Sequence, residues 1–352
     1  MATLKLPGLI DIHVHLRDPG ETHKEDFTTG TAAALAGGVV ALLDMPNNKP
    51  PTVDEESLRH KAELASQKAL CDFGFYLGAT TGNAGQTMTS RNVAGLKIYL
   101  DETYSPLRVT DVSTVVAHFR HWPSDKVIAV HAEGMATAAV IGLAQLYDRP
   151  AHMCHVSRKA EIELVRLAKE RGAKITCEVT PHHLFLTEDD GEALGSLGQM
   201  RPPLGRQEDR EALWANLAII DAVASDHAPH TIEEKRGKAP PPGVPGLETM
   251  VPLLLNAVAE GRLSMERVVE LTHYRPLSIM GVQPPADAYV EVDLDARYSL
   301  DGAELFTKCG WTPFEGMTVQ GRIRRVYLRG VKAYEDGKVV APPGWGKPLG
   351  LA

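Results

Sequence analysis

The sequence predicts an α/β fold, a (β/α)₈ barrel of the TIM type with a small C-terminal β appendage. Eight short apolar or β-branched runs alternate with helix-like stretches up to residue 226. Strands that alternate with helices pair in parallel through right-handed crossovers, and eight such units favour a closed barrel over an open sheet. The length of 352 residues fits one barrel of about 250 residues with a smaller extension.

The eight runs are expected to be strands and the stretches between them helices. The expected strands are Leu9–His15, Val39–Met45, Asp72–Ala79, Gly95–Leu100, Lys126–Glu133, Ala151–Val156, Ala173–Val179 and Ile219–Asp226. The expected helices between them include Phe27–Ala36, Asp54–Leu70, Asp111–His121, Arg158–Arg171 and Gln207–Leu217. Asp54 and Asp111 are typical helix N-caps, and Gly172 is a typical helix stop.

The pattern changes after the eighth strand. Residues 227–246 are rich in Pro and Gly, which predicts a long functional loop. Two helices that complete the barrel are then expected at Leu247–Ala259 and Ser264–Leu271. Three strands of the appendage are expected at Tyr289–Leu294, Gly321–Arg329 and Lys332–Val340. Asp336-Gly337 predicts a hairpin turn. We therefore expect a barrel over residues 1–286 and a β extension over residues 287–352 that packs on it.

Composition and charge exclude several classes of protein. Hydrophobic residues make up 43% and charged residues 23% of the chain, which excludes disorder, collagen and coiled coil. The net charge of −8 argues against a nucleic-acid groove or an anionic membrane as main partner. The chain has no apolar run of about 18 residues, no apolar stretch after Met1 and four cysteines that are not closely paired. We expect a soluble protein of a reducing compartment, the cytoplasm.

Histidines and one aspartate mark the expected strand ends. His13 and His15 are two residues apart on the first strand and so project to the same face. His131, His155 and Asp226 lie where later strands emerge at the C-terminal rim, the face that carries active sites in barrel enzymes. A His-x-His pair alone is also compatible with histidines bonded to backbone carbonyls. Four histidines and an aspartate on one rim favour a metal site, with zinc preferred over manganese, cobalt or iron.

Lys97 belongs to the same rim. It lies between Leu96 and Ile98 near a strand end, where a buried charge is costly. An outward-pointing lysine is the ordinary alternative. Burial favours the neutral amine, which is the form that reacts with carbon dioxide, and the resulting carbamate would bridge two metals.

A set of motifs covers nearly the whole chain. They are Pro7-Gly-Leu-Ile-Asp-Ile-His-Val-His-Leu-Arg-Asp-Pro-Gly20, Thr29-Gly-Thr-Ala-Ala-Ala-Leu-Ala-Gly-Gly38, Met45-Pro-Asn47, Gly95-Leu-Lys97, Cys154-His155-Val-Ser157, Thr180-Pro-His-His183-Leu184, Ala224-Ser-Asp-His-Ala-Pro-His230, Pro241-Pro-Gly-Val-Pro-Gly-Leu-Glu-Thr249 and Trp311-Thr-Pro-Phe-Glu-Gly316. In this combination the sequence resembles the amidohydrolase superfamily, and within it the dihydroorotase family. It is most similar to the dihydroorotase domains of animal multifunctional pyrimidine-synthesis proteins, which also carry carbamoyl-phosphate synthetase and aspartate transcarbamoylase.

The resemblance implies a binuclear zinc site. His13, His15 and Asp226 would hold one zinc ion and His131 and His155 the other, with carboxylated Lys97 as the bridge. A water molecule of lowered pKa would lie between the two ions. Asp226 would also be the proton shuttle, which takes the proton of the water and returns it to the departing nitrogen.

The substrate residues are predicted partly by chemistry and partly by the resemblance. Dihydroorotate and carbamoyl aspartate carry carboxylates, so an arginine is the expected anchor, and Arg17 lies two residues after His15. The expected binding residues are Arg17, Asn47, Thr103, Tyr104, Arg201, His230 and the backbone near Pro242. Thr103 and Tyr104 resemble a loop that covers bound substrate, although the relatives carry Phe where this chain has Tyr104. Arg201 on its own is more typical of a solvated loop.

Cys154 and Glu178 flank the predicted ligands. In the animal-type domain, the corresponding cysteine and glutamate are associated with an additional zinc ion, which would make the metal count three. The alternative is a buried thiol with a carboxylate that orients His155 or His13. Both interpretations stay open from the sequence.

The predicted activity is the reversible cyclisation of carbamoyl aspartate to dihydroorotate plus water, in pyrimidine biosynthesis. One alternative is an allantoinase or hydantoinase, but their substrates lack the ring carboxylate that Arg17 and Arg201 would bind. The other is a non-catalytic scaffold domain, but such domains usually lose metal ligands. The resemblance implies a homodimer and, as partners, the synthetase and transcarbamoylase domains of one polypeptide. The start at Met1-Ala2 and the end after Gly346 resemble an excised domain.

Overall fold

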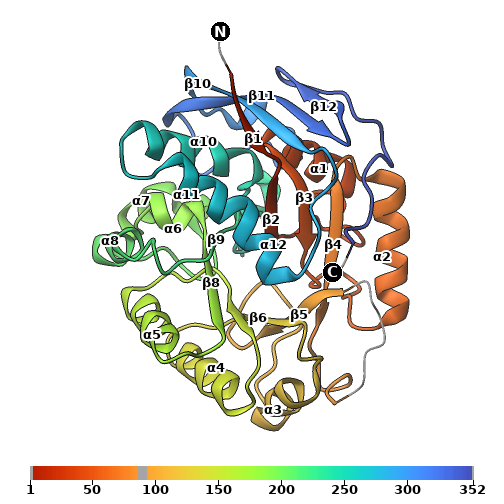
Figure 1. Cartoon of the computed structure of the whole chain (residues 1–352), viewed down its shortest axis with the longest axis vertical. Coiled ribbons are helices and arrows are strands. Elements are labelled where there is room, and N and C mark those ends of the chain that lie inside the picture. Colours follow the sequence, from red (N-terminus) through yellow and green to blue (C-terminus); the bar gives the residue numbers. More distant parts are fainter. Residues whose placement is uncertain (1–2, 86–92, 351–352) are drawn as a thin grey trace.

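The computed structural model describes residues 3–85 and 93–350. It contains an eight-stranded parallel sheet that curves into a barrel and a separate five-stranded antiparallel sheet at one end (Figure 1). The predicted fold class, a barrel with a small β appendage, is confirmed.

The barrel strands follow one another around the sheet in chain order. They are β2 (Leu9–Val14), β3 (Val39–Asp44), β4 (Asp72–Gly78), β5 (Val93–Tyr99), β6 (Val127–His131), β7 (Ala151–Met153), β8 (Ile175–Val179) and β9 (Ala222–Val223). A parallel bridge between Val14 and His227 joins the first strand to the chain just after the last. This bridge nearly closes the barrel, and it places Asp226 beside the end of β2.

All eight expected strands are present, but most are shorter than expected, β7 and β9 by the most. β7 ends at Met153 and β9 at Val223, so His155 and Asp226 lie just beyond strands. Both residues have positive φ values, 35° and 44°. Backbone of this kind does not continue a strand, and it is common at functional sites.

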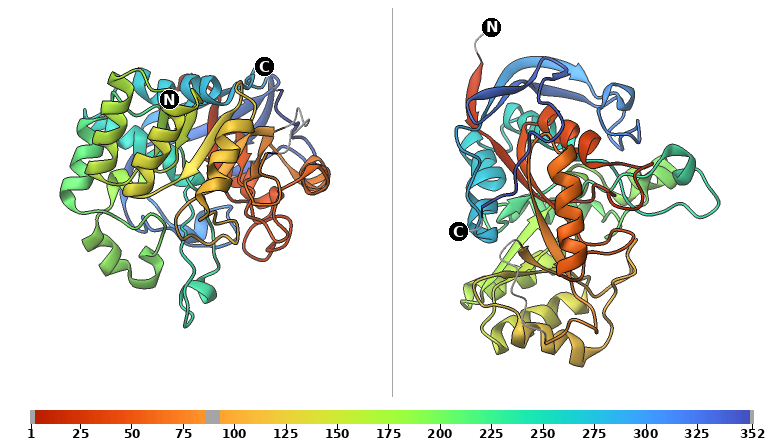
Figure 2. Two further views of the ribbon diagram at one scale, coloured as in Figure 1. Left: turned by 90° about the horizontal axis from the view of Figure 1, so that it is seen from below. Right: turned by 90° about the vertical axis from the view of Figure 1, so that its right-hand side faces the viewer.

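Helices cover the outside of the barrel (Figure 2). They are α1 (Phe27–Ala36), α2 (Glu55–Lys68), α3 (Val112–His121), α4 (Met135–Leu146), α5 (Lys159–Glu170), α6 (Pro181–Phe185), α7 (Glu188–Leu194), η1 (Gly195–Gly198), α8 (Gln207–Ala215), α9 (Ile232–Lys235), α10 (Leu247–Ala259), α11 (Met265–Val269), the π-helical turn η2 (Glu270–Tyr274), α12 (Arg275–Met280) and η3 (Gly302–Glu304). The expected caps are confirmed, because the side chains of Asp54 and Asp111 accept hydrogen bonds from Ser57 N and Thr114 N. Gly172 follows α5 with a φ of 76°, as a helix stop requires. The long segment after Asp226 includes α9, which the sequence did not predict.

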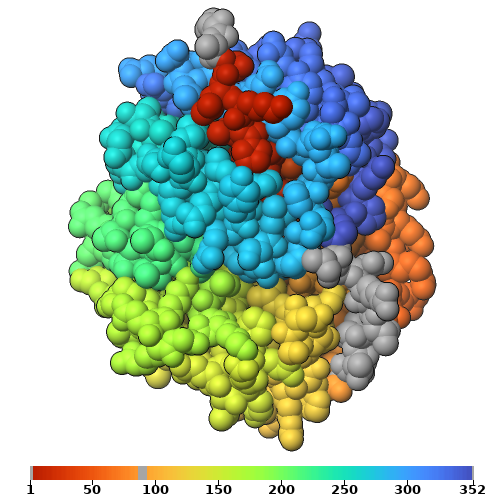
Figure 3. All heavy atoms as spheres, in the orientation of Figure 1, coloured from red at the N-terminus to blue at the C-terminus, as the bar shows by residue number. Residues whose placement is uncertain are grey.

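The second sheet has the order β1-β10-β11-β12-β13. Its strands are β1 (Leu4–Pro7), β10 (Tyr289–Ser299), β11 (Thr318–Leu328), β12 (Val331–Glu335) and β13 (Lys338–Val339). The predicted hairpin turn at Asp336-Gly337 joins the last two strands, with both residues at positive φ. β1 was not predicted. It pairs with β10, so the N-terminal segment lies against the C-terminal part of the chain (Figure 3).

The second sheet packs on the barrel helices α1 and α10, as expected. Gln320 N of β11 donates to Asn256 Oδ1 of α10 at 3.0 Å. One apolar core is continuous from the barrel into this sheet and includes Leu35, Leu255 and Val326. The boundary between residues 286 and 287 stays a prediction. No helix among the described residues combines the length and the apolar character needed to cross a membrane.

Candidate active site

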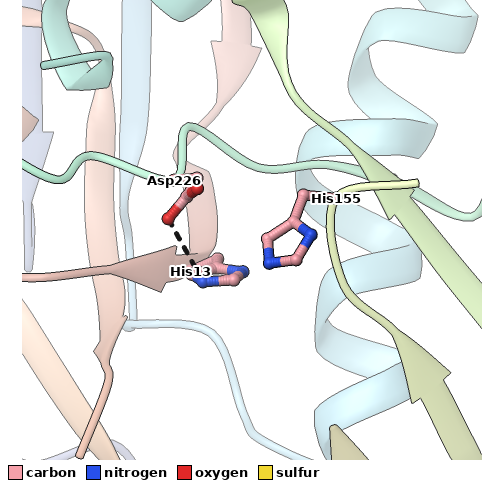
Figure 4. A group of neighbouring side chains, drawn as sticks. All are labelled: His13, His155 and Asp226. Carbon is pink, nitrogen blue, oxygen red and sulfur yellow. Dashed lines mark ion pairs between the residues drawn. The ribbon is translucent and has the colours of Figure 1, made fainter. Parts of the chain in front are cut away.

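Three of the predicted metal ligands converge at the C-terminal rim of the barrel (Figure 4). His13 comes from β2, His155 from the turn after β7 and Asp226 from the turn after β9. One ligand atom from each of the three lies within 4.8 Å of the others, and all three residues are buried. The barrel therefore brings together residues that are 71 to 213 positions apart in the chain.

Asp226 lies between His13 of β2 and His15, which comes directly after that strand. Its Oδ1 lies 3.3 Å from His13 Nε2 and 3.2 Å from His15 Nε2. The second ring nitrogen of His15, Nδ1, lies 2.7 Å from Asn47 Oδ1. A hydrogen bond of this kind fixes the ring and leaves Nε2 free to face the rim.

The other two histidines contact each other. His131 Nδ1 lies 2.9 Å from His155 Nε2. The Nδ1 atom of His155 is buried and has no hydrogen-bond partner among the described residues. Since a buried polar atom without a partner is costly, this pair of imidazoles fits a bound cation better than an isolated protein site.

Lys97 lies beneath these histidines and is fully buried. Its Nζ lies 2.9 Å from Cys154 Sγ. No carboxylate of the described residues forms an ion pair with it. Lys97 is thus a buried amine beside the predicted metal ligands, with Cys154 as its side-chain partner.

Cys154 and Glu178 form a second group with His13. Single ligand atoms of these three also lie within 4.8 Å of one another. Glu178 Oε1 is paired with His13 Nδ1 and accepts from His155 N, and Glu178 Oε2 lies 3.1 Å from His152 Nε2. The geometry is compatible with both interpretations drawn from the sequence, since Glu178 orients His13 and also stands beside a thiol.

The electrostatics of the site favour neutral imidazoles at His15, His131 and His155 and ionised carboxylates at Asp226 and Glu178, whereas His13 favours a proton. Burial lowers the pKa of His15 to about 4 and lowers the pKa of His131 and His155 as well. Burial and Lys97 also act to lower the pKa of His13, but the Glu178 and Asp226 carboxylates raise it, to about 10. Neutral imidazole is the metal-binding form, and the raised pKa of His13 reflects the negative charge of the two carboxylates beside it.

The same carboxylates have lowered pKa values. Burial acts to raise the pKa of Asp226, but the imidazoles of His13 and His15 hold it well below its usual range. The pKa of Glu178 is likewise low, because His13 and His152 outweigh the effect of its burial. The donor set therefore fits a divalent metal: three neutral imidazoles, charged carboxylate oxygens, and His13, whose proton a bound cation would displace.

A pocket of about 400 Å³ opens above this group. Of the predicted site residues, it is lined by His13, His15, Arg17, Asn47, Thr103, Tyr104, His131, His155, Arg201, Asp226 and Pro242. The lining does not include Lys97, Cys154, Glu178 or His230. His230 contacts the lining residue Arg17. The structure thus gathers the predicted metal and substrate residues around one cavity, while their individual roles stay predictions.

The predicted carboxylate anchors are held by the segment after β9. Arg17 is buried, and its Nε donates to Pro229 O at 3.2 Å. Its Nη2 lies 3.2 Å from His230 Nε2, which in turn lies 3.1 Å from Pro242 O. Burial, with the charges of Arg17, Lys24 and Lys235, lowers the pKa of His230. A neutral His230 beside Arg17 keeps the guanidinium free to bind an anion.

Tyr104 reaches over the pocket from the segment after β5. Its ring lies edge-on against His230, with 4.8 Å between the ring centroids. Its hydroxyl donates to Glu21 Oε1 at 2.7 Å, and the amines of Lys24 and Lys49 lie 2.7 and 3.0 Å from that hydroxyl. This hydrogen-bonded group needs the phenol hydroxyl of Tyr104.

Two residues near the site were missed from the sequence. Tyr99 lines the pocket and its hydroxyl has no partner among the described residues. A signal was present, because Tyr99 is two residues after Lys97 on β5 and so faces the same side. His182, at the start of α6, is buried and its charge would act on Asp226 and His13. His182 belongs to the motif Thr180-Pro-His-His183-Leu184, which contributes to the family resemblance. Its place beside Asp226 depends on the turn after β8.

Comparison with known proteins gives the family. A family model for the amidohydrolase family matches residues 4–176. The chain is 52% identical over 99% of its length to a multifunctional protein CAD of Squalus acanthias, and 46% identical over 98% to a multifunctional protein pyr1-3 of Dictyostelium discoideum. It spans only 16% of each of these two relatives. A dihydroorotase of Pyrococcus furiosus is 37% identical over 96% of this chain and 83% of its own length.

Solved structures agree on the fold. An L-hydantoinase from Arthrobacter aurescens has a TM-score of 0.94 at 25% identity, over 99% of this chain and 89% of its own. An inactive dihydroorotase-like domain of a CAD-like protein from Chaetomium thermophilum has a TM-score of 0.83 at 30% identity, over 99% of both chains. Because the identity is higher to whole dihydroorotases than to the hydantoinase, and extends over nearly the whole chain, this protein belongs to the dihydroorotase family of the amidohydrolases.

Proposed function

We propose that the chain catalyses the reversible, zinc-dependent cyclisation of N-carbamoyl-L-aspartate to dihydroorotate plus water. The observation that carries the proposal is the single pocket in which four histidines and Asp226 face two arginines, Arg17 and Arg201. The histidines and the aspartate suit a metal, and the arginines suit the carboxylates of this substrate.

The proposed cofactor is a pair of zinc ions held by His13, His15, His131, His155 and Asp226, with carboxylated Lys97 between them. Bound zinc would supply a Lewis acid that polarises the amide carbonyl and lowers the pKa of a water molecule. A third ion at Cys154 and Glu178 is a further part of the proposal. Its support is the grouping of those two residues with His13.

Asp226 is the proposed proton shuttle. In ring opening it takes a proton from the attacking water and gives it to the ring nitrogen that departs; in ring closure the proton moves the other way. Its low pKa keeps it ionised and ready to accept at neutral pH. Its position beside His13 and His15 places it on the rim where the reacting carbon must lie.

The remaining lining residues orient the substrate. Arg17 and Arg201 bind carboxylate oxygens, and Asn47 and His230 support that end of the ligand. Thr103 has a buried hydroxyl without a partner among the described residues, which makes it available to donate to substrate. Tyr104 excludes water from above. Because ring closure consumes a proton, the equilibrium favours dihydroorotate at lower pH.

The test is an assay of the purified, metal-loaded protein on dihydroorotate, carbamoyl aspartate, allantoin and hydantoin. Turnover is expected on the first two, and loss of turnover after exhaustive chelation. Dominant turnover of allantoin or hydantoin would instead support a hydantoinase-type enzyme, which the TM-score of 0.94 to an L-hydantoinase makes the second candidate.

A non-catalytic scaffold is the third candidate, because an inactive dihydroorotase-like domain shares 30% identity with this chain. The presence of His13, His15, Lys97, His131, His155 and Asp226 argues against it. A protein that contains no metal as isolated and turns over none of the four compounds would be such a scaffold.

The proposed setting follows from the multifunctional relatives. We propose that the chain works in the cytoplasm as a homodimer, next to carbamoyl-phosphate synthetase and aspartate transcarbamoylase domains of one polypeptide. The support is the 52% identity to a CAD protein of which this chain spans 16%. Sedimentation of the isolated chain tests the dimer.

A further inference from the structure

Lys235 is a buried cation in the wall of the pocket that the proposed chemistry leaves unused. It is the last residue of α9, and its side chain is fully buried. Burial alone accounts for its lowered pKa, and no ion pair with a carboxylate is present among the described residues to offset it. A buried lysine without a counter-ion is costly, so its partners are informative.

Those partners are three backbone carbonyls from two separate segments. Lys235 Nζ lies 2.8 Å from Gln199 O, 3.2 Å from Pro241 O and 3.1 Å from Gly243 O. An ammonium has three N–H donors, so each donor has one acceptor. The ring of Trp311 closes the site, with its centroid 5.5 Å from the amine.

Both segments lead directly into the pocket lining. Arg201 is two residues after Gln199, and Pro242 and Gly243 line the pocket themselves. Gly243 N also donates to Gln199 O at 2.9 Å, so one carbonyl serves both segments. Gly243 has a φ of 137°, and a Cβ there would lie 2.5 Å from Ala228 O. The two segments are therefore packed closely around the lysine.

We propose that Lys235 is a positioning residue for the substrate. Its ammonium ties residues 199–201 to residues 241–243 and so fixes the pocket wall that carries Arg201 and Pro242. Without a cation, Pro241 O and Gly243 O would lose this donor and Gln199 O would keep only Gly243 N, so the contact between the segments would weaken. This proposal rests on the proposed function for its kinetic consequence, but its structural consequence can be measured independently.

The charge of Lys235 also gives the wall a pH dependence. Burial lowers the pKa of Lys235 to about 8. The titratable group on which its charge acts is His230, whose pKa is lowered by burial and by the charges of Arg17, Lys24 and Lys235. A neutral amine has two N–H donors for three acceptors. The affinity of the wild-type protein for dihydroorotate is therefore expected to fall as the pH rises through about 8.

The first experiment is steady-state kinetics of Lys235→Met in the full, zinc-loaded chain. The KM for dihydroorotate is expected to rise about tenfold, with kcat changed by less than about threefold and zinc content unchanged. Lys126→Met is the matched control. Lys126 Nζ also donates to a backbone carbonyl, Val93 O at 2.6 Å, but at the start of β5, the opposite end of the barrel from the pocket. Its KM is expected to equal that of the wild type.

Hydrogen–deuterium exchange provides the readout that is independent of activity. Peptides covering residues 199–204 and 239–246 are expected to exchange faster in Lys235→Met and to remain protected in Lys126→Met. The pH series on wild-type binding needs no variant, so a misfolded Lys235→Met would not remove the test. Unchanged exchange, an unchanged KM, or wild-type binding that is flat from pH 7 to pH 9 would each overturn the role of Lys235. Absence of turnover in the wild type would overturn the proposed function alone.

Discussion

The two sides of the pocket are built in different ways. On the metal side, His13, Lys97 and His131 lie within barrel strands, and the parallel hydrogen bonds of the sheet set their positions. On the substrate side, Arg17, Arg201 and the segment around Pro242 lie in loops, and side chains from elsewhere hold them. The metal side thus inherits its geometry from the fold, whereas the substrate side needs dedicated anchors.

A second buried lysine supports this contrast. Lys61 of α2 is fully buried, and its Nζ lies 2.7 Å from Asp44 Oδ2, Met45 O and Asn48 Oδ1. Lys61 thereby holds Met45 and Asn48, which lie on either side of Asn47 in the chain. Unlike Lys235, Lys61 has a carboxylate partner, so the anchor at residues 241–243 is the more dependent on pH.

Metal removal should have the largest effect on activity, because it takes away the ions for which the barrel strands position their ligands. Exhaustive chelation of the purified protein is expected to abolish dihydroorotate turnover, and added zinc to restore it. The measurement is turnover alongside metal content by atomic emission. Full activity in metal-free protein would remove the basis for the metal side altogether.

Lys97→Ala should come next. Without the side chain that is proposed to bridge the two zinc ions, kcat is expected to fall about a thousandfold or more, with loss of bound zinc. Kinetics and metal analysis on the same preparation check this outcome. If Lys97→Ala kept normal turnover, Lys97 would be only a structural residue of β5.

Arg17→Ala should separate the two sides. Removing a buried charge that binds a carboxylate is expected to raise the KM for dihydroorotate about a hundredfold, with zinc content near normal. Arg166→Ala, on the exposed face of α5, is the matched control and should leave KM unchanged. Zinc loss in Arg17→Ala would mean that Arg17 supports the metal ligands and would blur the distinction between the sides.

Tyr104→Phe should have the smallest effect. It removes only the hydroxyl that contacts Glu21, Lys24 and Lys49, so the KM is expected to rise about threefold with kcat unchanged. Tyr274→Phe, at an exposed tyrosine, is the control and should match the wild type. A KM that does not change would show that the phenol contributes nothing beyond the ring it shares with Phe.

The sequence predicts the metal side better than the substrate side, for a physical reason. A buried parallel strand appears as an apolar run, so a polar residue at its end is conspicuous, as with His13 and His131. Strand lengths were less accurate, because β7 and β9 stop early where His155 and Asp226 take positive φ values. The local sequence alone does not predict those turns. Their role is visible only in the fold, where they bring His155 and Asp226 to the other predicted ligands.

The substrate side depends on contacts between distant segments. In Thr231-Ile-Glu-Glu-Lys235 the lysine has the pattern of an ordinary solvated helix end, and only the folding of residues 199–201 and 241–243 around it makes it buried. Arg17 was predictable from its spacing to His15, but its contact with His230 was not. β1 was missed because four residues give too short a pattern without their partner strand.

The pairing of β1 with β10 has a consequence for biosynthesis. Within this chain, β1 is synthesised before the whole barrel, and it has no partner strand until β10 has been translated. Such a non-local contact closes late and slowly, so the emerging chain must carry an unpaired strand edge while the barrel assembles.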